Sequence, residues 1–289
     1  ARYARMEAEW IYSIVTSLFQ SPPTRTQCAQ IDIASLPADT LLFVLGQETI
    51  LCNRQDSVRV VFICLSAFYS VRGILNQSLD GIRLLRRRRK KVAKNILPYT
   101  DAIIDYYPRH AEVLQKKLNN NLIVHSFLLN SISSGKRSVE FAKRRWDICI
   151  VGGRSKRREA VWKRLLVRGL SLSPASSECL EETILNSRLV LNIHSERYDN
   201  VEVPRIIAAI QNGVSVLSEP CYGLNDILPN NLIDICEYKD LGERALFLLS
   251  NPAFLHEMSD HARSWYDSVY QSKSSQTLVS TLESILRKI

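Results

Sequence analysis

Residues 188–220 constrain the fold of this chain more than any other stretch. They contain an apolar strand at 189–193, a polar loop, a helix that begins near Pro204 and a second apolar strand at 214–217. Apolar strands joined through one helix are typical of a βαβ unit in a parallel sheet that is buried on both faces. Ligands of open α/β sheets bind beyond the carboxyl ends of the strands. The residues at these two ends therefore predict a site: His194, Ser195, Glu196, Arg197, Glu202 and Glu219.

The remaining pattern predicts two α/β halves. In the first half we expect helices at 7–19, 79–94 and 109–118 and strands at 41–45, 58–65, 102–104 and 122–124. In the second half we expect strands at 147–151 and 232–235 and helices at 158–168, 177–186 and 241–289, beside the βαβ unit. The fold class is therefore α/β, with two Rossmann-like domains facing a cleft. Because the first half opens on a helix, we expect its first strand to be missing, or to be contributed by residues upstream of Ala1 in a longer chain.

A length of 289 residues suits two domains of about 100–150 residues each. We expect an N-terminal domain at 1–130, a linker at 131–145, where the chain turns polar and basic, and a C-terminal domain at 146–265. The terminal helix, residues 266–289, is expected to pack back on the N-terminal domain.

The net charge indicates the kind of partner, and the cysteines indicate the cellular compartment. A net charge of +9 predicts an anionic partner: a nucleic acid, an anionic membrane surface or a phosphorylated small molecule. The seven cysteines form no CxxC pair, so we expect neither a zinc site nor a disulfide framework, and a reducing cytoplasm fits best. No apolar run approaches the roughly 18 residues that span a bilayer.

The segment DICIVGGRSKRR at 147–158 combines a strand, a glycine turn and a basic helix start. Gly152 and Gly153 permit close backbone approach, and the helix N-terminus favours a phosphate group. Arg154, Lys156, Arg157 and Arg158 add cationic donors. The segment matches neither the GxGxxG fingerprint nor the Walker loop, and a tight βα turn with solvated bases is the alternative interpretation.

Together with LVLNIHSERYDNVEVPRIIAAIQNG and VSVLSEP, this segment resembles the nucleotide-sugar-binding domain of GT-B glycosyltransferases, in the group 1 and CgeB-like branch. The resemblance covers about residues 145–265. Many members of that branch carry two glutamates that would fall at Asn200 and Ala208 here, which puts the contacts to the donor ribose in doubt. Glu202 offers a shifted substitute beside Arg205.

The resemblance implies a glycosyltransferase that moves a sugar from a nucleotide-sugar donor to a hydroxyl of a glycan or lipid-linked acceptor. It implies neither a metal nor a permanently bound cofactor. The donor would contact Gly152, Gly153, Arg154, Arg157, Glu196, Arg197, Glu202, Arg205 and Glu219. His194 would hydrogen-bond the sugar or the developing diphosphate charge, although a structural histidine is the alternative. Glu48, preferred to Asp105, would deprotonate the acceptor.

Residues 83–94 hold eight basic side chains beside an apolar stripe. A basic amphipathic helix suits an anionic membrane surface, at the inner face of the membrane, or a polyanionic acceptor. It also suits nucleic-acid phosphates, although the run lacks interleaved aromatic residues, and a solvated helix is the plainest alternative. Two other functions stay open: a catalytically inactive GT-B-like binding subunit, and a DNA-binding or DNA-glycosylating protein that uses this helix.

Overall fold

The computed structural model describes residues 5–19, 24, 30–45, 50–64, 79–118, 122–130, 139–152, 155–173, 180–195 and 203–288. The chain divides into two compact units. The N-terminal unit comprises the chain up to Leu129 together with residues 273–289, and the C-terminal unit comprises residues 130–272. Each unit is described by itself below.

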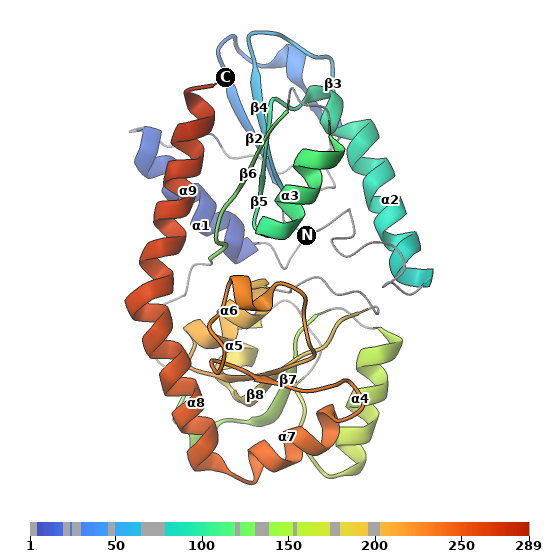
Figure 1. Ribbon diagram of the computed structural model, residues 1–289, viewed down its shortest axis with the longest axis vertical. Helices are drawn as coiled ribbons and strands as arrows, with labels where there is room; N and C mark the ends of the chain where they lie inside the picture. Colours follow the sequence, from blue (N-terminus) through green and yellow to red (C-terminus); the bar gives the residue numbers. More distant parts are fainter. Residues whose placement is uncertain are drawn as a thin grey trace. The chain divides into compact units, whose positions relative to one another are not determined.

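The N-terminal unit is built on a four-stranded parallel sheet in the order β2-β4-β5-β6 (Figure 1). Its strands are β2 (Leu41–Leu45), β4 (Arg59–Cys64), β5 (Ala102–Asp105) and β6 (Ile123–Ser126). Two further strands, β1 (Gln30–Asp32) and β3 (Ile50–Cys52), pair in parallel with each other. Strand β4 is buried from Val60 to Cys64, as expected for a central strand whose two faces are both covered.

Four helices belong to this unit: α1 (Arg5–Phe19), α2 (Leu79–Asn95), α3 (Pro108–Lys117) and α9 (Gln271–Leu286), of which residues 273–286 are assigned to it. Helix α3 lies against β5 and β6 (Figure 1). Helix α9 is tied to the end of β6, because the Thr281 hydroxyl donates to the carbonyl of Ser126 over 3.2 Å. Short 3-10 turns lie at Ile33–Ser35 and Leu97–Tyr99.

The C-terminal unit is built on a second four-stranded parallel sheet, in the order β10-β9-β8-β7. Its strands are β7 (Trp146–Ile150), β8 (Ser187–Asn192), β9 (Ser215–Ser218) and β10 (Asp234–Ile235). On the other side of β7 runs the segment 171–173, where Leu172 bridges Ile148 in parallel and Ser173 N–H donates to the Ile148 carbonyl over 2.9 Å. The chain thus leaves β7 toward one side and then returns to form β8 on the other, which makes the carboxyl end of β7 and β8 a topological switch point.

The helices of this unit are α4 (Lys156–Val167), α5 (Leu180–Leu185), α6 (Val203–Gln211), α7 (Leu241–Leu249) and α8 (Pro252–Trp265), followed by a π-helical turn at Tyr266–Tyr270. Short 3-10 turns lie at Phe141–Lys143 and Leu224–Asp226. The core joins α4, the sheet and the last helices through Val161, Leu189, Leu217, Leu248 and Leu255, each fully buried.

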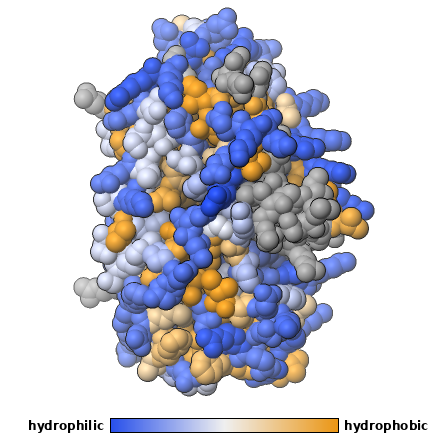
Figure 2. All heavy atoms as spheres, viewed as in Figure 1, coloured by the Kyte–Doolittle hydropathy of each residue, from blue (hydrophilic) through white to orange (hydrophobic). Residues whose placement is uncertain are grey.

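The surface of the described residues is mainly hydrophilic on the face that Figure 2 shows, with scattered apolar patches. Helix α2 illustrates how this surface forms. Leu85 and Val92 are buried in the N-terminal unit together with Ile96, which follows the helix. Most of its basic side chains are exposed: Arg83, Arg86, Arg87, Arg89, Lys90 and Lys94. Leu85 and Val92 of the apolar stripe therefore pack on the core, while the charged face meets solvent together with Leu79 and Ala93. None of the described helices combines the length and the apolar character needed to cross a membrane.

Candidate functional site

The carboxyl ends of β7, β8 and β9 lie side by side in the C-terminal unit. Register pairs Leu191 with Leu217 and Asn192 with Ser218, and the Glu219 N–H donates to the Asn192 carbonyl over 3.2 Å. Gly152 follows β7, His194 follows β8 and Glu219 follows β9. Parallel pairing thus gathers residues at the switch point that are far apart in the sequence.

Glu219 joins three elements of this edge. The residue is 6% exposed, its Oε1 accepts the backbone N–H of His194 over 3.0 Å, and its Oε2 forms an ion pair with Arg157 Nη2. Burial raises the pKa of the Glu219 carboxyl, and the positive charge of Arg157 opposes that rise. The carboxylate is thus occupied by partners from β8 and α4.

Arg157 is held in place while part of it stays accessible. Its guanidinium lies 4.0 Å from the ring centroid of Tyr238, and the Tyr238 hydroxyl donates to the Arg157 carbonyl over 2.9 Å. Its side chain nevertheless remains 22% exposed. A cation that is oriented on one side and open on the other is suited to bind an anion, because little side-chain entropy is lost on binding.

The side chain of Arg158 accounts for the presence of a glycine after β7. Its Nε donates to the Ile193 carbonyl over 2.8 Å, and the residue is 5% exposed. Gly152 has a φ of +120°, and a Cβ placed there would lie 2.5 Å from Arg158 Nη1. Gly152 therefore lets a buried guanidinium cross the end of β7, in a backbone conformation that other residues rarely adopt.

A second polar cluster lies between β8, β9 and α6. Asn192 Nδ2 donates to Ser218 Oγ over 2.9 Å, and both side chains are fully buried. Arg205 Nη1 donates to Asn192 Oδ1 over 3.3 Å and contacts the Ile193 carbonyl over 3.4 Å. Cys221 Sγ lies 3.4 Å from His194 Nε2. These contacts place the side chain of Arg205 at the same edge as the Arg157–Glu219 pair.

Five of the residues proposed from the sequence therefore lie at one edge: Gly152, Arg157, His194, Arg205 and Glu219. Six others fall outside the described residues: Glu48, Gly153, Arg154, Glu196, Arg197 and Glu202. Arg158, which the sequence also offered as a phosphate contact, is instead buried and donates to the Ile193 carbonyl. The sequence analysis did not single out Asn192, Ser218 and Cys221. A polar residue directly after an apolar run, at the end of each strand, was the available signal for Asn192 and Ser218.

Asp105, the second candidate for the base that deprotonates the acceptor, is 1% exposed, and both of its carboxylate oxygens have hydrogen-bond partners. Its Oδ2 lies 2.5 Å from His110 Nδ1 and its Oδ1 accepts the Tyr107 N–H over 2.8 Å. Among the described residues, Cys64, Asp105 and His110 each offer one ligand atom, and these atoms lie within 4.8 Å of one another. Because both carboxylate oxygens are occupied at the start of α3, we assign Asp105 a structural role there.

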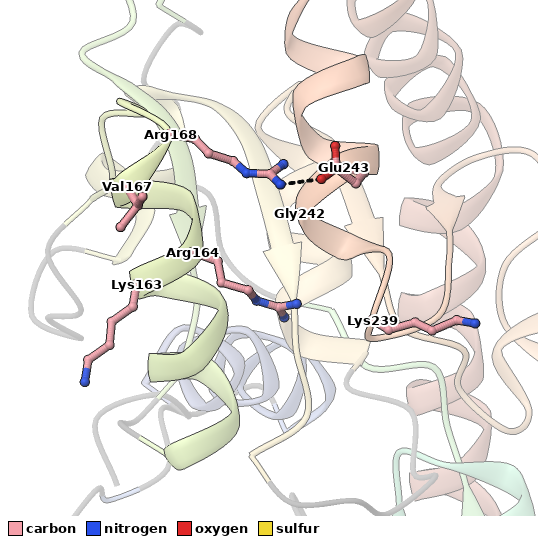
Figure 3. A pocket seen from close by; sticks show the side chains of 7 residues that line it. All are labelled: Lys163, Arg164, Val167, Arg168, Lys239, Gly242 and Glu243. Carbon is pink, nitrogen blue, oxygen red and sulfur yellow. Dashed lines mark hydrogen bonds and ion pairs between the residues drawn. The ribbon is translucent and has the colours of Figure 1, made fainter.

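A pocket of about 330 Å³ lies away from this edge, along the second half of α4 (Figure 3). Its lining consists of Lys163, Arg164, Val167, Arg168, Lys239, Gly242 and Glu243. Arg168 forms an ion pair with Glu243 across it, and both side chains are exposed to solvent. The pocket is a basic surface depression, separate from the strand ends where the candidate site lies.

The raised pKa of Glu219 has a consequence for stability. The pKa of this carboxyl is higher in the folded chain than in the unfolded chain, where it is about 4.3. Such a group stabilises the fold at pH values below its pKa in the unfolded chain. The stabilisation is lost as the pH rises through its pKa in the folded chain. We expect the free energy of unfolding of the wild type, relative to Glu219→Gln, to fall as pH rises from about 4 to 7. Urea unfolding of both proteins across this range measures the difference. A relative gain by the wild type would show instead that the pairing with Arg157 outweighs burial.

Comparisons with known proteins identify the fold. No protein-family model matches the chain, and no curated protein sequence matches it. Among solved structures it is similar to TarM, with a TM-score of 0.56 and 10% identity over 83% of this chain and 55% of TarM. It is also similar to WaaG, a glycosyltransferase involved in lipopolysaccharide biosynthesis, with a TM-score of 0.51 and 14% identity over 78% of each chain.

A third similar structure is a trehalose-6-phosphate protein from E. coli bound with UDP-2-fluoro glucose, with a TM-score of 0.52 and 10% identity. The match covers 98% of this chain and 77% of that one. The chain spans about half the length of TarM and about three quarters of the other two. The fold is therefore that of the GT-B glycosyltransferases, as the sequence motifs predicted.

Proposed function

We propose that this chain is a metal-independent GT-B glycosyltransferase that transfers a sugar from a nucleotide sugar to a hydroxyl of a glycan or lipid-linked acceptor. The observation that carries the proposal is the gathering of Arg157 and Arg205 at the switch point of the C-terminal sheet, beside the N-terminus of α4. Structures of similar fold support the donor class, since the E. coli structure is bound with UDP-2-fluoro glucose.

The donor diphosphate would bind at the start of α4. Helix N-termini attract anions through the helix dipole and their unpaired N–H groups. The guanidinium of Arg157 is oriented by Glu219 and Tyr238 and partly exposed, so it adds a charge-assisted contact to one phosphate. Arg205, anchored on Asn192, supplies a second cation from α6. Gly153 and Arg154 complete the proposed phosphate loop.

Glu219 acts through Arg157 in this proposal. Its two carboxylate oxygens are already paired with the His194 N–H and with Arg157, so it is a positioning residue rather than a direct ligand of the sugar or ribose. Glu196, Arg197 and Glu202 remain the proposed partners of the donor hydroxyls and phosphates.

Transfer would form a bond between the acceptor oxygen and the anomeric carbon while the bond from that carbon to the diphosphate breaks. The cations and the dipole of α4 would stabilise the negative charge that develops on the departing diphosphate. Such preorganised charge supplies what a metal supplies elsewhere, which is why we propose a metal-independent reaction. Glu48 is the proposed base for the acceptor hydroxyl, and His194 the proposed group beside the sugar.

Helix α2 is the proposed contact for the acceptor. Its exposed bases would attract an anionic membrane surface or an anionic glycan, with about 1 kcal/mol for each basic residue near the surface. Because Val92 is buried in the core, contact would rely on charge and not on insertion of the helix. This would place the protein at the cytoplasmic face of a membrane as a peripheral protein.

An inactive binding subunit is the second candidate, and Ala208 favours it. This residue occupies a glutamate position of the family motif and is 3% exposed within α6. The two candidates differ in turnover: both retain the fold, and only a transferase releases nucleoside diphosphate from its donor in the presence of an acceptor.

A thermal-shift panel of UDP, GDP, CMP, dTDP and ADP tests the proposal on the full chain. A ligand at 100 times its dissociation constant stabilises a protein by about 2.7 kcal/mol. We expect one nucleotide to raise the melting temperature of the wild type and to lose most of this effect with Arg205→Ala. No shift with any nucleotide would count against a donor site in this chain.

A further inference from the structure

Cys221 faces His194, and the proposed transfer reaction, which places His194 beside the sugar, gives the thiol itself no role. Cys221 lies two residues beyond Glu219, with its Sγ 3.4 Å from His194 Nε2 and 3.9 Å from Asn192 Nδ2. The imidazole is 3% exposed, whereas the thiol residue is partly exposed. A partly exposed cysteine thus faces a buried nitrogen base.

Two other cysteines of this unit have opposite surroundings. Burial raises the pKa of the Cys149 thiol to about 11. Burial and the negative charges of Asp234 and Asp240 raise the pKa of the Cys236 thiol to about 11 as well. Cys221 and Cys236 are both partly exposed, so the two differ mainly in the groups that face them. Cys236 is therefore a matched internal control.

We propose that Cys221 and His194 form a thiolate–imidazolium pair, and that Cys221 is a modification site for low-molecular-weight disulfides. In the neutral tautomer that leaves Nε2 unprotonated, His194 accepts the thiol proton. The thiolate then attacks one sulfur of the disulfide, a new S–S bond forms to Cys221, and the original S–S bond breaks. The second sulfur departs as a thiolate and takes up a proton. The cysteine is oxidised to a mixed disulfide while the reagent is reduced to a thiol.

The groups around the pair act in both directions. The Cys221 thiol also donates to the Glu219 carbonyl over 3.3 Å, a contact that is lost when the proton moves to His194. The Glu219 carboxylate opposes the thiolate but is paired with Arg157. Arg158 contacts the Ile193 carbonyl and Arg205 contacts Asn192, so both guanidinium groups lie at the same edge. Ser218 Oγ lies 3.7 Å from the sulfur and the Asn192 amide points to it, which adds neutral hydrogen-bonding groups. Cations and hydrogen bonds at a thiolate lower the pKa of a cysteine below its usual value of about 8.5.

A group attached to Cys221 would lie at the edge where Arg157 and Arg205 are proposed to hold the donor. Formation of the mixed disulfide would then weaken nucleotide binding, and reduction would restore it. This consequence rests on the proposed function, whereas the reactivity of the thiol does not.

The test is the pH profile of iodoacetamide labelling of the folded full chain, resolved by peptide mass spectrometry. We expect Cys221 to react with an inflection below pH 7.5, and at pH 6.5 at least about 10-fold faster than Cys236. His194→Gln should move the inflection for Cys221 toward about 8.5. An inflection at or above 8.5 in the wild type would overturn the proposal. If the variant does not fold, labelling of the wild type in urea replaces it, and an unchanged inflection there would also overturn the proposal.

Glutathione disulfide provides the second readout. We expect a mixed disulfide at Cys221 that dithiothreitol reverses and that is absent from Cys221→Ser. If the modified protein binds nucleotide as well as the reduced protein, the link to the donor site is wrong although the reactive thiol stands. If the reduced protein binds no nucleotide at all, the proposed function fails while the labelling result remains valid.

Discussion

Replacing Arg157 with alanine is expected to weaken the binding of a nucleoside diphosphate by about 10- to 100-fold, equivalent to about 1.4–2.8 kcal/mol. The guanidinium is proposed to contact a phosphate, and charge-assisted hydrogen bonds of this kind are among the stronger ones in proteins. The substitution also leaves the buried Glu219 without its cation, which reinforces the loss because an anion at the edge then repels the diphosphate. Titration calorimetry with the nucleotide found in the thermal-shift panel measures the change.

Arg164→Ala is the matched control for this experiment. Arg164 lies on the same helix and its guanidinium is 5.6 Å from the ring centroid of Tyr238, the ring that Arg157 also covers. It lines the pocket of Figure 3 instead of the strand ends. We expect Arg164→Ala to change the affinity by less than about 3-fold. Equal losses in both variants would mean that net charge, and not the contact at the edge, governs binding.

The second large effect is expected from Arg144→Ala, which should lower the free energy of unfolding by about 3–5 kcal/mol. Arg144 is 9% exposed and donates to three backbone carbonyls: Val139 over 3.0 Å, Ser187 over 3.2 Å and Gly213 over 3.1 Å. These carbonyls belong to the segment before β7, the start of β8 and the turn before β9. Burial lowers the pKa of the Arg144 guanidinium, whereas the carbonyls that accept its hydrogen bonds stabilise the charged form.

Arg145→Ala controls for the loss of one arginine at this place. Arg145 is exposed and its guanidinium lies 4.6 Å from the ring centroid of Trp146. We expect this variant to lose less than about 1 kcal/mol. Denaturant unfolding followed by circular dichroism compares the two. Comparable losses would show that Arg144 is not the link between the strands of this unit.

The sequence predicted the architecture because the signals of a buried parallel sheet are local. Continuous apolar runs gave β8 and β9 to within two residues, and the basic helix at 79–94 appears as α2 at Leu79–Asn95. The opening helix was predicted at 7–19 and is found at Arg5–Phe19. Strands β1 and β3 were missed, because each has three residues and neither shows a sustained apolar pattern.

The site was predicted only in part because its partners are set by register. Pairing of Asn192 with Ser218 and the reach of Arg158 to the Ile193 carbonyl depend on how strands align, which no local pattern encodes. Gly152 was proposed as a place where a phosphate approaches the backbone. In the structure its missing side chain makes room for Arg158, a reason that only tertiary contacts reveal.

The central claim is that a nucleoside diphosphate sugar binds at the carboxyl edge of the C-terminal sheet. Hydrogen–deuterium exchange of the full chain, measured with and without this donor, tests it most directly. Peptides that cover residues 151–158 and 193–221 should exchange more slowly when the donor is bound, because these segments form the proposed site. The pocket segment at 239–249 should be unaffected. Protection confined to α2, to the pocket of Figure 3 or to no peptide at all, at a donor concentration that saturates the thermal shift, would contradict a donor site at the carboxyl edge of the C-terminal sheet.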